Sequence, residues 1–181
     1  MALSAGNRTR RHLISIRAYA LADAATLTEI ANDEEVSRYM TQAFPYPYTL
    51  DDARVWLSTA SLERPIDNFA IEVDGVLAGG VGLRLATGEG SGVAEIGYWL
   101  GRAFWNRGLA TEAVAKCVEY AFDVRRLRRL EAYVFAPNVT SARVLEKCNF
   151  SREGVLREAV ICRDGTVADA WLYALLRRDW E

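Results

Sequence analysis

The chain has 181 residues, of which 51% are hydrophobic and 25% charged, and its formal net charge is −2. This length and composition predict one globular domain with a sizeable core. The small negative charge argues against a general nucleic-acid or membrane-surface binder, since such proteins carry a basic excess. We expect a single domain over residues 12–181, preceded by a flexible, basic N-terminal segment over residues 1–11.

The sequence also argues against a membrane span and a metal site. No stretch reaches the roughly 18 apolar residues of a membrane span, and the first residues lack the apolar centre of a signal peptide. We therefore expect a cytoplasmic protein. The three cysteines include no closely spaced pair, and His12 is the only histidine. Neither a zinc site nor a serine–histidine–aspartate triad is expected.

The first half of the sequence predicts strands and helices around an aromatic loop. Apolar periodicity indicates, in chain order, a strand over residues 13–17, a helix within residues 20–39, a helix over residues 51–60, and strands over residues 69–73 and 76–85. Thr49 or Asp51 is suited to cap the second helix. Residues 44–49 contain two prolines among aromatic residues and therefore predict an irregular loop. Asp74-Gly75 is a typical hairpin turn between the two strands.

The second half predicts an alternation of strands and helices that ends in a hairpin. The expected elements are a strand over residues 93–100, a helix over residues 109–123, a strand over residues 129–135, a helix over residues 138–147, and strands over residues 154–163 and 167–176. Asn138 can cap the second of these helices. Because the strand over residues 129–135 follows a helix, we expect it to lie parallel to a nearby strand through a right-handed crossover.

The most informative stretch is residues 95–113, an apolar strand that ends in a glycine turn and opens a helix. The first turn of a helix leaves about four N–H groups unpaired and carries a partial positive charge. Gly108 permits close approach to the backbone, and small Ala110 and Thr111 keep the mouth of the helix open. The pattern predicts bound phosphate. Because neither the dinucleotide fingerprint nor the nucleotide P-loop ending is present, the surrounding motifs must identify that phosphate.

Those motifs resemble a known family. Residues 105–113 read Trp-Asn-Arg-Gly-Leu-Ala-Thr-Glu-Ala and follow a Glu-Ile-Gly-Tyr-Trp-Leu strand. This is similar to the acetyl-CoA turn of the GNAT N-acetyltransferases, and within them to the ribosomal-protein alanine N-acetyltransferases, the RimJ and RimL branch. Further segments match in the same order, at residues 32–40, 44–45, 52–57 and 138–147.

The resemblance implies a fold and an activity. The fold is an α+β arrangement of three layers, with a mixed, mostly antiparallel, twisted sheet of six to seven strands. A central parallel pair splays apart, and helices flank the sheet. The implied reaction moves an acetyl group from acetyl-CoA to a primary amine, favouring a protein N-terminus, by direct attack in a ternary complex. No metal is implied.

The resemblance also places the cofactor. In the family, the glycine turn binds the pyrophosphate through backbone amides, the free strand edge pairs with the pantetheine arm, and the last helix lies near the thioester. The residues implied to contact acetyl-CoA are Ile96, Tyr98, Trp99, Leu100, Arg102, Arg107, Gly108, Leu109, Ala110, Thr111, Asn138, Ser141 and Arg143.

Two residues are candidates for proton transfer. An alkyl amine is mostly protonated at neutral pH and must lose a proton before it attacks. Glu95 interrupts an otherwise apolar strand, and we interpret it as the general base, acting directly or through water; partial burial would raise its pKa. A solvent-facing strand residue is the simpler alternative. Many GNAT enzymes protonate the leaving thiolate with a tyrosine, but that position here is Leu145, so Ser141 is the candidate acid. Its alternative role is hydrogen bonding at the helix N-terminus with Asn138.

The acceptor site and partners stay open. Tyr39, Phe44 and Tyr46, together with Tyr48, are candidates to wall the amine pocket beside Glu95, or they only pack the loop. Related GNAT branches acetylate small amines or antibiotics, so such an acceptor is one alternative. A second alternative is an acyl-CoA-binding regulatory module that has lost turnover. The arginines at positions 125, 126, 128 and 129 are more typical of a solvated helix end than of an anion site. We expect no nucleic-acid or membrane partner, and either a monomer or a homodimer.

Overall fold

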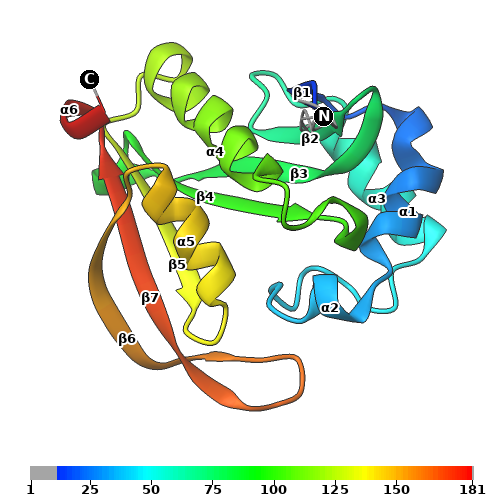
Figure 1. Ribbon diagram of the computed structural model, residues 1–181. Helices are drawn as coiled ribbons and strands as arrows, with labels where there is room; N and C mark the ends of the chain where they lie inside the picture. The colour runs from blue at the N-terminus through cyan, green and yellow to red at the C-terminus, as the bar shows by residue number, and fades with distance from the viewer. Residues whose placement is uncertain (1–11, 181) are drawn as a thin grey trace, which may run out of the picture.

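A seven-stranded mixed sheet organises residues 12–180, the part of the chain that the computed structural model describes. The strands are β1 (Ile14–Ala18), β2 (Asn68–Val73), β3 (Val76–Leu85), β4 (Val93–Leu100), β5 (Arg129–Phe135), β6 (Ser151–Ile161) and β7 (Val167–Leu176). They lie in the order β1-β2-β3-β4-β5-β7-β6 (Figure 1). Strands β4 and β5 are parallel, and the other neighbours are antiparallel. The predicted mixed sheet with one parallel pair is confirmed, whereas the flexible segment predicted over residues 1–11 lies outside the described residues.

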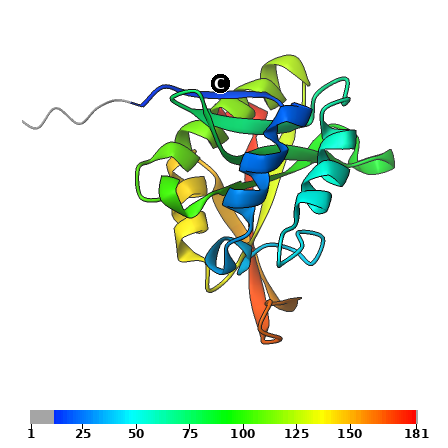
Figure 2. The same ribbon diagram turned by 90° about the vertical axis from the view of Figure 1, so that its right-hand side faces the viewer.

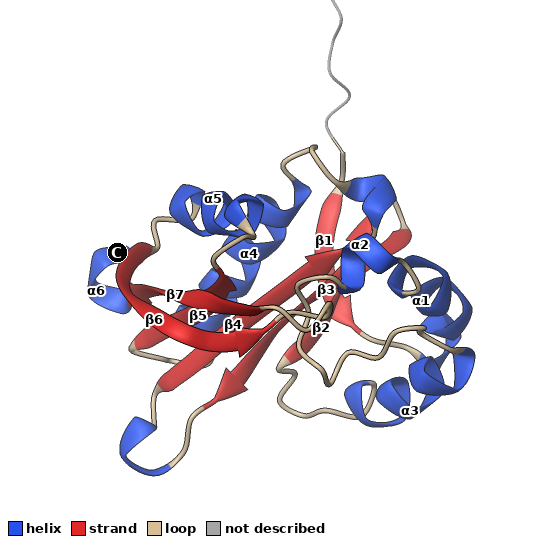
Figure 3. Ribbon diagram, turned by 90° about the horizontal axis from the view of Figure 1, so that it is seen from below, coloured by secondary structure: helices blue, strands red, loops and turns tan. Residues whose placement is uncertain are grey.

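Helices cover both faces of the sheet. They are α1 (Ala24–Ala31), α2 (Glu34–Ser37), α3 (Leu50–Ala60), α4 (Leu109–Glu119), α5 (Val139–Lys147) and α6 (Arg177–Trp180). Helices α4 and α5 lie on one side of the sheet and α1 and α3 on the other (Figure 3). The larger core cluster joins α4 and α5 to the sheet through buried Val114, Cys117 and Leu145, and a smaller one joins α1 and α3 through buried Leu27 and Leu57. Across residues 12–180, no helix has the length and apolar character that a membrane span requires.

The continuous helix predicted within residues 20–39 is wrong. A 3₁₀ turn over Leu21–Asp23 leads into α1, and a separate α2 begins after Asp33. Asp33 has an extended backbone, and its carboxylate accepts hydrogen bonds from the N–H groups of Glu35 and Val36. A side chain that caps in this way starts a new helix, so the apolar periodicity runs across a break that it does not show.

Two other predicted boundaries also differ. The helix expected over residues 109–123 is α-helical only to Glu119, and a π turn over Tyr120–Val124 completes it. Arg126 then adopts a left-handed conformation, with φ of 54°. The strand expected over residues 154–163 runs from Ser151 to Ile161, because two register shifts against β7 disturb its alternation of inward and outward side chains. The predicted bounds of β4, β5 and β7 are confirmed.

Candidate active site

The parallel strands β4 and β5 diverge beyond a short paired stretch, and we call this diverging region the splay. Pairing between them covers only Val93 to Glu95 on β4 and Arg129 to Glu131 on β5. Both strands continue beyond that point, β4 to Leu100 and β5 to Phe135. In the described structure, β4 pairs beyond Glu95 with β3 alone. The edge of β4 that faces β5 therefore offers N–H and C=O groups to a ligand that lies in the strand direction.

The first turn of α4 follows the open end of β4. Gly108 is the residue before α4, with φ of 76° and no side-chain cap on the helix, and Asn106 is also left-handed at φ of 60°. Left-handed backbone suits glycine, and the space beside Gly108 is open. The Trp105 indole donates to the Leu100 carbonyl at 2.7 Å and fixes the turn to the strand. The first N–H groups of α4 thus lack internal partners at an exposed turn, which favours an anion.

Side chains around this turn divide into buried and exposed groups. Leu109 is buried in the core, while Ala110 and Thr111 are partly buried on the helix. Arg102 and Arg107 are exposed on either side of Trp105. The Cys148 thiol lies 3.5 Å from the Thr111 carbonyl and joins the end of α5 to this turn. The structure therefore brings the predicted phosphate-contacting residues together around one backbone turn with two flexible cations.

Tyr98 and Ser141 connect β4 to the first turn of α5 across the splay. The Tyr98 hydroxyl lies 2.9 Å from the Ser141 Oγ and donates to the Ser141 carbonyl oxygen, also at 2.9 Å. Burial raises the pKa of Tyr98, although the hydrogen bond with Ser141 opposes that shift. The Asn138 side chain accepts from the Ser141 N–H at 3.2 Å. Asn138 therefore holds the backbone of Ser141, and the Ser141 hydroxyl faces Tyr98.

Glu95 lies at the closed end of the splay. It pairs in register with Glu131 on β5 and with Arg84 on β3. Its carboxylate forms an ion pair with the Arg84 guanidinium. The Arg84 side chain is 81% exposed and that of Glu95 is 29% exposed, so the pair lies at the protein surface. An exposed ion pair of this kind stabilises a fold weakly and is readily separated by a ligand.

Glu95 has polar neighbours on β5 that were not among the predicted site residues. Glu131 accepts a hydrogen bond from Arg129 at 2.7 Å, and the Tyr133 hydroxyl lies 3.4 Å from the same carboxylate group. Burial, followed by the charges of Glu131 and Glu95, raises the pKa of Tyr133. The signal available in the sequence is the alternation of these residues along β5, which places them on one face. Arg84 could not be found in this way, because its contact with Glu95 depends on the register between β3 and β4.

The aromatic loop between α2 and α3 lies against both arms of the splay. The Phe44 ring packs edge-on against Trp99 of β4, with ring centroids 5.3 Å apart. The Tyr39 ring packs edge-on against Phe135 of β5 at 6.4 Å. Tyr46 is exposed, whereas Tyr48 is buried and contacts Phe44. The three predicted acceptor residues therefore lie on one loop at the wide end of the splay.

Arg143 and Leu145 have other surroundings. Arg143 lines a cavity of about 540 Å³ with Glu146, Arg152, Trp171 and Tyr173. By helical rotation, this is the flank of α5 opposite Ser141, so the contact of Arg143 with cofactor phosphates stays a prediction. Leu145, at the family's tyrosine position, is fully buried in the core and cannot reach a ligand.

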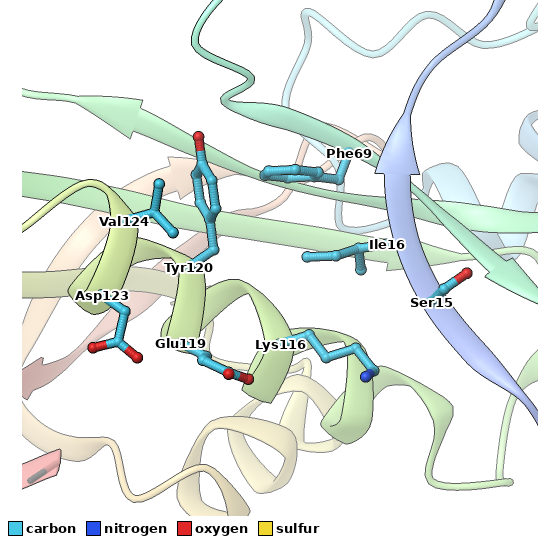
Figure 4. Close-up of a pocket in the computed structure, with 8 residues that line it drawn as sticks. All are labelled: Ser15, Ile16, Phe69, Lys116, Glu119, Tyr120, Asp123 and Val124. Atoms are coloured by element: carbon cyan, nitrogen blue, oxygen red, sulfur yellow. The ribbon is translucent and has the colours of Figure 1, made fainter.

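A second cavity lies away from the splay. It has a volume of about 400 Å³ and lies between β1 and the end of α4 with the π turn that follows it (Figure 4). Its lining is Ser15, Ile16, Phe69, Lys116, Glu119, Tyr120, Asp123 and Val124. The Tyr120 hydroxyl donates a hydrogen bond to the Ile66 carbonyl at 2.7 Å. No predicted site residue borders this cavity.

The arginines after α4 do not form one basic site. Arg125 forms an ion pair with Asp67, and Arg128 donates to the Ser91 carbonyl. Arg129 binds Glu131 and both carboxylate oxygens of Glu153. Three of the four side chains thus have structural partners. Over residues 12–180, no group of three or more histidine, cysteine or acidic side chains could hold a metal ion.

Comparison with known proteins identifies the family. The acetyltransferase (GNAT) domain family matches residues 14–151, which is most of the chain. The chain belongs to the GNAT acetyltransferases. The "Uncharacterized N-acetyltransferase p20" of Bacillus licheniformis is 35% identical over 174 residues, with 92% of this chain and 94% of that protein covered. The predicted enzyme class, an acetyl-CoA-dependent N-acetyltransferase, is thereby confirmed.

Solved GNAT structures share the fold. Mycobacterium smegmatis RimJ, in complex with CoA-disulfide, superposes with a TM-score of 0.82 at 26% identity, covering 92% of this GNAT chain and 83% of that one. RimL, a ribosomal L7/L12 alpha-N-protein acetyltransferase in complex with coenzyme A, has a TM-score of 0.79 at 18% identity, covering 93% and 96%. At this low identity, the similarity between this chain and RimL concerns the fold alone. The predicted similarity of this GNAT enzyme to RimJ and RimL is confirmed in its structure.

Proposed function

We propose that this GNAT enzyme acetylates a primary amine of the protein N-terminal class, with acetyl-CoA and the amine bound together. The observation that carries the proposal is the splay of β4 and β5, which has the uncapped first turn of α4 at its open end and a carboxylate at its closed end. The acceptor class rests on the likeness to RimJ and on the aromatic loop beside the splay.

The residues present fit coenzyme A. Gly108 leaves open space beside the first turn of α4, where backbone N–H groups can hold a pyrophosphate. Arg102 and Arg107 are exposed nearby and add positive charge. The free edge of β4 from Ile96 to Leu100 can hydrogen-bond the amide groups of a pantetheine arm, and Ile96 anchors that strand in the core. From the start of α5, Ser141 contacts Tyr98 of β4, and the Asn138 side chain holds the Ser141 N–H.

Acetyl-CoA supplies the acetyl thioester when bound, and the strand edge supplies electrostatic support. An N–H of β4 that points into the splay can donate to the acetyl oxygen as negative charge develops there. Such a donor is held rigidly, because β3 pairs with the other edge of β4 from Ala94 to Leu100. A fixed donor in a confined site avoids the reorganisation that water would need.

Glu95 is placed to take the proton of the amine. Its carboxylate lies on the strand that lines the splay, at the end opposite the phosphate turn. The Arg84 guanidinium is the present partner of this carboxylate. A protonated amine that reaches Glu95 can replace the exposed Arg84 as the partner and then transfer its proton, either directly or through water.

Ser141 is placed to return a proton to the departing thiolate. Its hydroxyl lies beside Tyr98, whose phenol stays protonated because burial raises its pKa. Either oxygen can be the donor in the contact between the two hydroxyl groups, so the Tyr98 phenol can donate to Ser141 Oγ and leave the Ser141 hydrogen free for the thiolate. Water then restores the proton of the serine. We assign Ser141 the role of acid and Tyr98 the role of a positioning residue.

A thiol-release assay tests the function. The purified enzyme is mixed with acetyl-CoA and, separately, with peptides that begin with alanine, with polyamines and with aminoglycosides. Release of free CoA with the alanine peptides at least about tenfold faster than with the other amines supports the proposal. Faster release with a polyamine or an aminoglycoside would show that the acceptor belongs to another class. Binding of CoA without release with any amine would favour a regulatory module over an enzyme.

A further inference from the structure

The β6–β7 hairpin reaches across the molecule to the aromatic loop. The hairpin extends away from the sheet, and its tip lies beside the segment that follows α2 (Figures 1 and 2). The residues in contact are more than a hundred positions apart in sequence. A contact of this kind links the far edge of the sheet to the segment that covers the wide end of the splay.

Arg163, at the tip of the hairpin, makes this link with two hydrogen bonds. Its Nε donates to the Ser37 carbonyl at 3.1 Å, and its Nη2 donates to the Phe44 carbonyl at 2.7 Å. Ser37 is fully buried at the end of α2, and Phe44 packs on Trp99. The guanidinium therefore holds two backbone points on either side of Tyr39, and its planar, forked donors suit two acceptors at once.

Further contacts hold the same two segments together. The Arg163 guanidinium lies 6.0 Å from the centre of the Tyr46 ring. Next to it, hydrogen bonds from Thr166, together with the charge of Arg38, lower the pKa of Asp164. The hairpin turn is itself fixed, because Asp164 accepts from the Thr166 N–H at 2.9 Å and from its hydroxyl at 2.6 Å.

The loop that Arg163 holds bridges both arms of the splay. Phe44 contacts β4 through Trp99, and Tyr39 contacts β5 through Phe135. Between these two points the loop over residues 40–43 has neither regular helix nor regular strand, so its position depends on such anchors. Trp99 is on the same face of β4 as Glu95, because the two residues are four apart on the strand. The loop therefore covers the face on which the proposed base lies.

We infer that Arg163 is a positioning residue, which fixes the aromatic loop across the mouth of the splay and thereby sets the affinity for the acceptor amine. This inference rests on the proposed function. The loop packs on the C-terminal halves of β4 and β5, so we expect Arg163 to control the acceptor side and to leave the affinity for acetyl-CoA unchanged.

The test compares Arg163→Gln and Arg163→Lys with a matched control, Arg157→Gln, an exposed arginine on β6. Three quantities are measured: amide hydrogen exchange over residues 38–48, the KM for an alanine-starting peptide, and the Kd for acetyl-CoA. We expect faster exchange in R163Q and a KM raised about tenfold, since charge-assisted hydrogen bonds are lost. R163K should recover part of both, and R157Q should match the wild type.

Three results would overturn the inference: unchanged exchange in R163Q, faster exchange with an unchanged KM, or a Kd for acetyl-CoA that rises in step with the KM. The thermal unfolding midpoints of the variants separate these results from global unfolding, and R163K keeps the charge if R163Q fails to fold. Failure of the proposed function is a different result. There the wild type itself acetylates no amine, while exchange over residues 38–48 still reports whether Arg163 holds the loop.

Discussion

The hydroxyl groups of Tyr98 and Ser141 lie 2.9 Å apart and join the splayed strand β4 to the first turn of α5. Leu145, at the family's tyrosine position on α5, is fully buried and has no hydroxyl group to donate. Tyr98 lies on the part of β4 that does not pair with β5, and we assigned Ser141 the role of proton donor to the leaving thiolate. The role assigned to this pair leads to the first prediction.

Ser141→Ala is expected to lower kcat by roughly 100-fold, the usual size of a general acid's contribution. Tyr98→Phe keeps the ring in place and is expected to lower kcat by a smaller factor, because the serine is misplaced rather than removed. The double variant should be no slower than S141A alone, since the two residues act as one unit. Steady-state rates at saturating acetyl-CoA check this, and additive losses would show that Tyr98 acts independently.

Glu95→Gln should lower kcat/KM for the amine by roughly 100-fold at neutral pH. The loss should shrink as the pH rises, because more of the amine is then neutral without help from a base. The matched control is Glu72→Gln, a strand carboxylate of similar exposure that pairs with Arg17 and lies on β2, which β3 separates from β4. A pH profile of E95Q that parallels the wild type would remove Glu95 from proton transfer.

Gly108→Glu should abolish the thermal stabilisation that CoA gives to the wild-type enzyme. The new side chain adds negative charge and bulk at the turn that we assign to the pyrophosphate. Gly75→Glu is the matched control, because Gly75 is also left-handed, with φ of 83°, and has open space around it on the β2–β3 turn. Both variants carry similar backbone strain, of about 1–2 kcal/mol. Equal stabilisation by CoA in G108E and G75E would rule out this turn as the phosphate site.

Asp23 gives a prediction for acid stability. Burial opposes ionisation of Asp23, but hydrogen bonds from Arg17 and the Ala20 N–H outweigh it and lower its pKa below the usual 3.8. A carboxyl whose pKa is lowered by folding stabilises the protein above its unfolded pKa, and this contribution is lost as the pH falls through the folded value. Asp23→Asn should therefore be less stable than the wild type at pH 7, with a difference that narrows below about pH 4. Urea unfolding at several pH values measures it, and a difference independent of pH would contradict this origin.

Local patterns were sufficient to predict much of this structure. Strong apolar periodicity and capping residues placed β4, β5 and α5 correctly, and the Asn138 cap is present as expected. The break between α1 and α2 was missed because Asp33 interrupts the helix through its side chain without disturbing the apolar spacing. Likewise, the sequence places Glu95 on a strand but gives no sign of Arg84, because strand register is a tertiary property.

Long-range contacts were the least predictable part of the site. Arg163 lies in a hairpin turn whose sequence predicts only the turn, and its partners are backbone carbonyls, which any residue possesses. No residue type at positions 37 and 44 could therefore have indicated the contact. In contrast, the family resemblance made the aromatic side chains at positions 39, 44 and 46 candidates for an acceptor wall, and that role stays a prediction. The contacts of Tyr39 and Phe44 with the two strands of the splay could be seen only in the fold.

The most direct test of the central claim is to locate the acetyl group on the product. A peptide with a free N-terminal alanine and one internal lysine is incubated with the enzyme and acetyl-CoA, alongside the same peptide with a blocked N-terminus, and both are analysed by fragment mass spectrometry. We predict acetylation of the free α-amino group only, with the blocked peptide unmodified and E95Q greatly slowed. Acetylation of the lysine in both peptides would contradict N-terminal acetylation at the splay. The same holds if the enzyme binds CoA but acetylates neither peptide.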